Sequence, residues 1–182
     1  GFEAGGHNGR EETTTLVLIP AVAKAVDIPV IAAGGIATGR QMLATMVLGA
    51  EGVQVGSRFI ASEEASSHPA FKEAVVKAVE GDTQLSMKAL TPVRLLKNPF
   101  YTQVQEAENR GASIQELKEI LGRARAKRGM YEGDMQEGEL EIGQVSALVE
   151  EILPAGLIVE NIWKEFSEAL HNPIKNNSFT TK

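Results

Sequence analysis

Two short apolar runs that each end in a glycine turn constrain the fold of this chain most strongly. The first run, PVIAAGG over residues 29–35, has strand length and no polar alternation, as expected for a strand buried on both faces of a parallel sheet. The second run, EGVQVGS, occupies residues 51–57. Residues 38–49 between them have helical spacing, and Thr38 and Gln41 are placed as a capping box. This order of strand, helix and strand predicts a βαβ unit with a right-handed crossover.

Apolar spacing indicates which helix faces are buried. Before the first strand, Leu16, Ile19 and Val22 recur at helical intervals and predict a short amphipathic helix. In the helix between the two strands, Met42, Met46 and Val47 mark the inner face. A last helix is predicted after residue 154 by an apolar stripe at i,i+4 spacing, formed by Ile158, Ile162, Phe166 and Leu170.

From Ser62 onward the chain is predicted to be mostly helical, because no further β-type run is recognised. Pro69 suits the first position of a helix that runs to Gly81. A capping-box pattern at Ser113 begins another helix, for which Gly129 is the predicted stop. Residues between these helices carry little periodic pattern, so they are predicted to be connecting segments.

Composition and charge exclude several classes of function. The chain has 18 basic and 24 acidic residues and a net charge of -6, which argues against a nucleic-acid partner because phosphate binding needs a positive surface. It contains no cysteine, and its three histidines are far apart in sequence, so neither thiol chemistry nor a metal site is expected. No membrane span of roughly 20 apolar residues and no signal peptide is recognised. We therefore expect a cytoplasmic protein with a small-molecule substrate and no membrane partner.

The two glycine turns are candidate phosphate sites. Backbone N–H groups in glycine-rich turns and at helix N-termini bind phosphate without a cationic side chain. Gly34, Gly35 and the helix start near Thr38 form one candidate, and Gly56 and Ser57 form another with an added hydroxyl. Barrels of the (β/α)8 type often bind phosphate after their last two strands. Either glycine pair alone also fits an ordinary tight turn, so that alternative stays open.

The opening segment GFEAGGHNG supplies a candidate general acid or base. His7 lies there between glycines that let a ligand approach the backbone, and imidazole has an unperturbed pKa of about 6.5. A lone histidine more often has no catalytic role. His68 is explained as part of a helix start and His171 as an exposed helix end. A basic cluster over residues 123–128 could face a nucleotide phosphate, but its place at a helix end before an acidic loop favours a structural role.

Four segments taken together resemble the nitronate monooxygenase family, which also contains the FMN-dependent enoyl-ACP reductases. They are GFEAGGHNG, PVIAAGGIATG, LGAEGVQVGSRF and HPAFKEAVV, in the order and spacing of the family, and the resemblance covers about residues 1–170. It implies an α/β fold, the C-terminal part of a TIM (β/α)8 barrel with about strands 6–8 and a helical subdomain over FMN. It also implies His7 as the catalytic histidine and Gln144 as a residue near the substrate. The implied cofactor-binding residues are Ala4, Gly5, Gly6, Ala33, Gly34, Gly35, Gly56 and Ser57.

The resemblance also suggests that a large part of the barrel is missing. Family barrels carry five complete strands and most of a sixth before the glycine–histidine loop, so we expect these 182 residues to be the C-terminal half of a longer flavoenzyme. The expected organisation is a barrel segment over residues 1–61, a helical subdomain with closing helices over 62–172, and a disordered tail over 173–182. An open sheet leaves apolar edges exposed, so homo-oligomer formation through those edges is expected.

Three functions stay open from the sequence. The first is a nitronate monooxygenase, which oxidises alkyl nitronates with O2 to a carbonyl compound and nitrite, with His7 as base or electrostatic partner. The second is an enoyl-ACP reductase that passes hydride from NADH or NADPH through FMN. The third is an inert fragment that serves only as a binding or assembly piece, because catalytic geometry tolerates little looseness. The sequence favours the first activity for the parent enzyme and predicts that the isolated chain is inactive.

Overall fold

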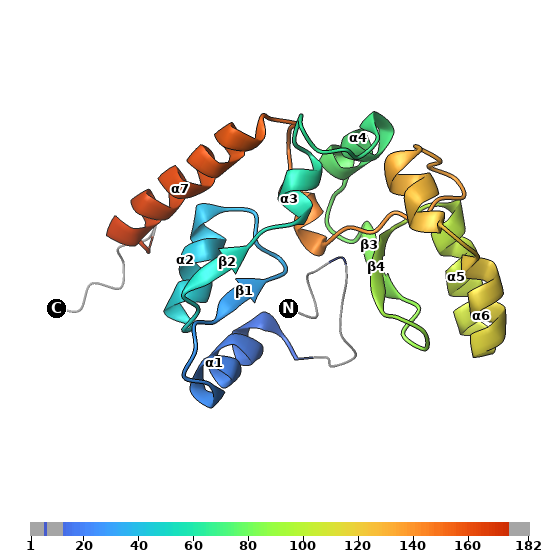
Figure 1. Ribbon diagram of the computed structural model, residues 1–182, viewed down its shortest axis with the longest axis horizontal. Coiled ribbons are helices and arrows are strands. Elements are labelled where there is room, and N and C mark those ends of the chain that lie inside the picture. The colour runs from blue at the N-terminus through green and yellow to red at the C-terminus, as the bar shows by residue number, and fades with distance from the viewer. Residues whose placement is uncertain (1–5, 7–12, 175–182) are drawn as a thin grey trace.

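The computed structural model describes Gly6 and residues 13–174 (Figure 1). The predicted βαβ unit is present as β1 (Ile31–Ala33), α2 (Gly39–Val47) and β2 (Gly52–Gln54). The two strands pair in parallel, with Ala32 opposite Val53. The prediction of a βαβ unit is therefore confirmed.

Two helices cover this unit, α1 (Thr15–Ala25) and α7 (Ala155–His171). Helix α1 packs Ile19 against Ala32 of β1 in a small apolar core. Helix α7 lies across α2 (Figure 1). At the crossing, a Cβ added to Gly39 would lie only 2.1 Å from the backbone nitrogen of Phe166. The absence of a side chain at Gly39 is what lets the two helices approach this closely.

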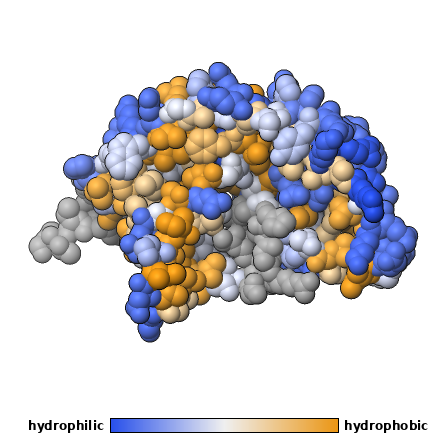
Figure 2. Space-filling model, in the orientation of Figure 1, coloured by the Kyte–Doolittle hydropathy of each residue, from blue (hydrophilic) through white to orange (hydrophobic). Residues whose placement is uncertain are grey.

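Several apolar side chains of α1, β1 and α2 are exposed. This contradicts the predictions that β1 is buried on both faces and that Val47 and Leu16 lie on inner helix faces. Ile31 of β1 is 57% exposed and only Ala32 of that strand is buried, so β1 is not covered on both faces. Val47, predicted on the inner face of α2, is 77% exposed, and Leu16 of α1 is also exposed. The sheet of β1 and β2 has two strands within the described residues, so no neighbouring strand or helix covers these positions. Figure 2 shows hydrophobic residues gathered at this end of the molecule.

The second part of the chain combines helices with a β-hairpin. Its elements are α3 (Ser57–Ile60), α4 (Pro69–Lys77), β3 (Thr83–Ser86), β4 (Val93–Leu96), α5 (Pro99–Asn109), α6 (Ile114–Leu121), the π-helix η1 (Lys127–Tyr131) and the 3-10 helix η2 (Gln144–Leu148). Strands β3 and β4 are antiparallel, with Leu85 opposite Arg94. The prediction that no β-type run follows Ser62 is wrong: every residue of β4 is buried, so the strand lacks the alternation that reveals a half-buried strand. Helix α4 begins at Pro69 as predicted but ends before Gly81.

Helix α6 has the predicted start and a different end. Ser113 caps it as expected, but the helix stops at Gly122, whose φ is +62°. Gly129 lies instead inside η1, where its Cα would be 2.2 Å from a Cβ added to Gly138. Close backbone packing, not helix termination, therefore explains Gly129. The acidic loop after η1 neutralises part of the basic cluster, as expected, through the ion pairs Arg125–Glu137 and Arg128–Asp134.

A second core lies between α4 and the residues that flank η2. Phe71 and Val75 of α4 are completely buried and pack with Leu140 and Val149, which flank η2. This core fixes η2 beside α3 and α4. Across the described residues, no helix is both long enough and apolar enough to cross a membrane.

Candidate functional site

Gly34 and Gly35 form the turn that follows β1. Their φ angles are +94° and +72°, values that residues with a side chain rarely adopt. Within the described part of the chain, neither of their backbone N–H groups has a hydrogen-bond acceptor. Backbone N–H groups exposed in such a turn can bind an anion. Among the described residues, the turn therefore offers two backbone donors without an acceptor.

The backbone N–H groups at the start of α2 are already hydrogen-bonded within the chain. This contradicts the prediction that they would form part of the phosphate site at Gly34 and Gly35. The side-chain oxygen of Gln41 accepts from the N–H groups of Ala37 and Thr38, at 2.8 and 3.1 Å. The backbone N–H of Gln41 donates to Thr38 Oγ1 at 3.2 Å. The Gly39 N–H donates to Glu165 Oε2 of α7 at 2.8 Å. The chain thus uses its own acceptors at the helix start, and the open N–H groups are those of the glycine turn itself.

Gly56 and Ser57 follow β2 at the beginning of the four-residue helix α3. A Cβ added to Gly56 would meet nothing within 4 Å, so there is free space at this position. Ser57 Oγ accepts a hydrogen bond from the backbone N–H of Gly143 at 3.0 Å. Because a hydroxyl carries one proton of its own, Ser57 can still donate to a ligand.

Arg58, next to Ser57, anchors α3 and does not face the turn as a free cation. Its guanidinium is buried and donates to the carbonyl oxygens of Ala61 and Glu151, at 3.4 and 3.2 Å. Burial lowers the pKa of Arg58, while the negative charge of Glu151 raises it. Any anion held at Ser57 would therefore depend on backbone and hydroxyl donors.

Gln144 and Gly35 line the same hollow, which has a volume of about 330 Å³. Gln144 is the first residue of η2, directly after Gly143, and is exposed. The hollow also includes Glu80, from the segment after α4. The structure therefore brings together two predicted site residues that are more than a hundred positions apart.

Gly6, the one described residue of the opening segment, lies close to the start of η2. Its carbonyl oxygen accepts from the Arg94 N–H at 2.7 Å, and the Ile142 N–H donates to the Arg94 carbonyl at 3.1 Å. A Cβ added to Gly6 would lie 3.3 Å from the Ile142 carbonyl carbon. Gly6 thus lies beside the residue that precedes Gly143. The predictions for His7, Ala4 and Gly5 fall outside the described residues.

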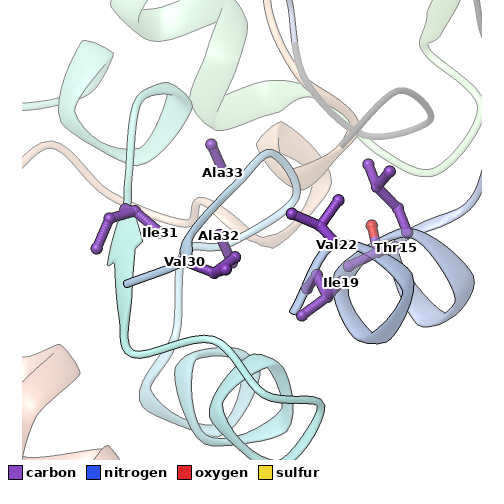
Figure 3. Close-up of a pocket in the computed structure, with 8 residues that line it drawn as sticks. Thr15, Ile19, Val22, Val30, Ile31, Ala32 and Ala33 are labelled. Atoms are coloured by element: carbon purple, nitrogen blue, oxygen red, sulfur yellow. The ribbon is translucent and has the colours of Figure 1, made fainter. Parts of the chain in front are cut away.

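Ala33 belongs to a different hollow, between α1 and β1, with a volume of about 160 Å³. Figure 3 shows Ile19 and Val22 of α1 opposite Ala32 and Ala33 of β1. The lining is almost entirely apolar, apart from Thr15. This hollow lies at the exposed surface of the open sheet, so we do not assign it to the phosphate site.

One buried acid lies outside the turns. Glu139 is 6% exposed, and its backbone N–H donates to the Arg125 carbonyl at 3.1 Å. Burial, and to a smaller extent the negative charge of Glu141, raises the pKa of Glu139 to about 7, although Arg125 acts in the opposite direction. The carboxyl of Glu139 therefore keeps its proton to a higher pH than an exposed glutamate does.

Sequence reasoning missed Gly143 and Glu165, which contact predicted site residues. Glu165 bonds to Gly39 across 126 positions, and Gly143 bonds to Ser57 across 86. Neither residue has a local pattern that signals such a contact. The sequence signal for Gly143 is its position directly before Gln144, which the family resemblance implies as a site residue.

The comparisons with known proteins identify the family. The family model described as "Nitronate monooxygenase" matches residues 1–165. The chain belongs to the nitronate monooxygenase family. It is 34% identical to a probable nitronate monooxygenase of Staphylococcus saprophyticus, covering 94% of this chain and 50% of that protein. The family resemblance stated from the sequence is therefore confirmed.

Solved structures agree with this family assignment. FabK from Thermotoga maritima is 44% identical with a TM-score of 0.87, covering 95% of this chain and 54% of that one. A nitroalkane oxidase from Streptomyces ansochromogenes is 32% identical with a TM-score of 0.76, covering 96% of this chain and 52% of that one. The chain spans about half the length of these relatives. The parallel β1–β2 pair is consistent with a partial (β/α)8 barrel of this family.

Proposed function

We propose that these residues form the phosphate-binding side of an FMN-dependent oxidoreductase, with Gly34, Gly35, Gly56 and Ser57 as the phosphate ligands. The observation that carries the proposal is the pair of open turns after two neighbouring parallel strands, the second leading into the short helix α3. Barrels of the (β/α)8 type commonly bind phosphate at such a place, with a short extra helix after the strand. Gly6 and Ala33 are proposed to line the cofactor nearby, together with Ala4 and Gly5.

The residues present fit a phosphate group. In the described chain, the N–H groups of the four proposed ligands have no backbone acceptor, and the space beside Gly56 is empty of protein atoms. The Ser57 hydroxyl adds a donor whose oxygen is already oriented by Gly143. FMN would supply the electron-transfer chemistry, and the chain's own task is to bind and orient it.

The first candidate activity is oxidation of alkyl nitronates with O2, giving a carbonyl compound and nitrite. The family assignment and the names of the curated relatives support it. We propose that His7 acts as the base on a neutral nitroalkane, or as the electrostatic partner of a nitronate. Gln144 is proposed to contact substrate from the hollow that it shares with Gly35.

The second candidate activity is reduction of an enoyl-ACP thioester by NADH or NADPH. One observation supports it: the chain is 44% identical to FabK, and that match covers 95% of this chain. The two activities are distinguished by mixing the flavin-loaded protein with NADH or NADPH in the absence of a nitro compound. Rapid bleaching of the flavin band favours the reductase, and an unchanged band together with nitrite release from a nitronate favours the monooxygenase.

The cofactor itself is tested by a visible spectrum of the purified chain, taken after excess FMN is added and removed by gel filtration. A retained flavin band supports the proposal. Gly35→Ala, which forces a side chain into a backbone conformation at φ +72°, is expected to weaken retention at least tenfold. Gly156→Ala is the matched control, because a Cβ there meets nothing within 4 Å. A colourless wild-type chain would contradict FMN binding by these residues alone and favour the third possibility, an inert binding or assembly piece.

The organisation and partners of the protein are part of the same proposal. We propose residues 1–61 as a barrel segment, 62–172 as the part that covers the flavin, and 173–182 as a tail. The exposed apolar side chains of α1, β1 and α2 support association with a second copy or with further barrel strands. A small-molecule substrate, with neither nucleic acid nor membrane as partner, and a cytoplasmic location complete the proposal.

A further inference from the structure

Segment η2, which carries Gln144, depends on contacts with other elements for its position. It is a five-residue 3-10 helix, and its entry residue Gly143 is buried. Short 3-10 segments have poorer internal hydrogen bonds than α-helices. The direction in which Gln144 projects is therefore determined by what holds the residues at the start of η2.

The start of η2 is held on two sides. On one side, the Ile142 N–H donates to the Arg94 carbonyl of β4 at 3.1 Å. On the other side, the Gly143 N–H donates to Ser57 Oγ at 3.0 Å, across 86 positions of the chain. Of these two hydrogen bonds, the one to Ser57 Oγ links η2 to the proposed phosphate turn.

The Ser57 hydroxyl can serve both partners at the same time. A serine hydroxyl has one proton to donate and two lone pairs to accept. Its oxygen accepts from Gly143, which leaves the proton for an anionic oxygen at the turn. Donation to an anion polarises the hydroxyl and strengthens the bond that its oxygen accepts. Removing the hydroxyl would leave a buried N–H group without this acceptor.

We propose that Ser57 is a positioning residue that couples phosphate binding at the glycine turns to the placement of Gln144. Phosphate bound by Ser57 tightens the bond to Gly143, which fixes η2 against the hollow shared by Gln144 and Gly35. Loss of phosphate loosens the same bond. The coupling rests on the proposed function for its ligand, whereas the anchoring of Gly143 by Ser57 is independent of it.

The anchoring is tested by amide hydrogen exchange of Gly143, measured by NMR in the full 182-residue chain. Ser57→Ala is expected to speed exchange of the Gly143 amide by about tenfold, because the hydrogen bond that protects this buried N–H group is lost. Ser57→Thr, which keeps the hydroxyl, is expected to stay within threefold of wild type. Ser62→Ala is the control, since that buried hydroxyl donates to the Phe59 carbonyl and does not contact Gly143. Equal exchange in wild type and Ser57→Ala would overturn the anchoring.

The coupling is tested with FMN and with riboflavin, which lacks the phosphate. FMN is expected to slow exchange of the Gly143 amide in wild type and Ser57→Thr, riboflavin to leave it unchanged, and Ser57→Ala to lose the response to FMN. Retained FMN with no change at Gly143 would overturn the coupling while leaving the proposed function standing. No retention of FMN at any concentration would overturn both the proposed function and the coupling.

Discussion

Replacement of Gly39 by alanine tests the crossing of α2 and α7 directly. The added Cβ would lie 2.1 Å from the Phe166 nitrogen, 2.3 Å from the Ile162 carbonyl oxygen and 2.7 Å from the Glu165 carbonyl carbon. All three atoms belong to the backbone, so rotation of a side chain cannot relieve the overlap. Helix α7 would have to retreat by about 1.3 Å to restore a van der Waals contact of 3.4 Å.

The expected cost follows from two losses and one gain. Overpacking of this kind costs about 1–3 kcal/mol. The retreat also breaks the bond from the Gly39 N–H to the Glu165 carboxylate, and hydrogen bonds to charged groups contribute about 1.5–3 kcal/mol. Alanine is a better helix former than glycine by at most about 1 kcal/mol. The free energy of unfolding is therefore expected to fall by about 2–4 kcal/mol.

Urea denaturation, followed by the fluorescence of Trp163, measures this change. Trp163 is the only tryptophan of the chain and lies on α7, in contact with Phe166 at a ring-centroid distance of 5.4 Å. The midpoint is expected to fall by about 1–2 M urea. Gly156→Ala in α7 is the control and is expected to stabilise the chain slightly, because its Cβ meets no atom. A Gly39→Ala variant within about 0.5 kcal/mol of wild type would refute the close crossing.

Three further predictions concern the cap, the hairpin and the buried acid. Thr38→Ala removes the cap of α2 and is expected to cost about 0.5–2 kcal/mol in urea denaturation; an unchanged midpoint would contradict it. Leu95→Ala is expected to cost about 2–5 kcal/mol because Leu95 is completely buried in β4, whereas Ile114→Ala at an exposed position should have little effect. Since the folded-state pKa of Glu139 is raised to about 7, the folded chain binds more protons than the unfolded chain between the unfolded pKa, about 4.3, and pH 7. Stability is thus expected to fall as pH rises through that window, by no more than about 4 kcal/mol, and Glu139→Gln should remove this part of the slope in denaturation curves collected from pH 4 to 8.

The sequence was sufficient for the elements whose signals are local. The capping boxes at Thr38 and Ser113 began helices where predicted, because a side chain that bonds to a backbone amide three residues away needs no tertiary partner. The glycine turn at Gly34 and Gly35 was also predicted, since a positive φ favours glycine whatever surrounds it. The hairpin of β3 and β4 was missed, because complete burial of β4 removes the alternation that identifies a strand.

The candidate site also combines features that the sequence predicted with features that depend on tertiary contacts. The residue types that suit a phosphate, the glycines and the hydroxyl of Ser57, could be read from their positions after two apolar strands. The sequence did not reveal which neighbouring N–H groups are free to bind a ligand. At the start of α2, for example, the Gly39 N–H donates to Glu165, which lies 126 positions away. The convergence of Gly35 with Gln144, and the bond from Gly143 to Ser57, also depend on distant segments. Local backbone preferences were thus determined by the sequence alone, whereas the availability of each donor was decided by tertiary packing, because a hydrogen-bond donor is free only where no distant acceptor reaches it.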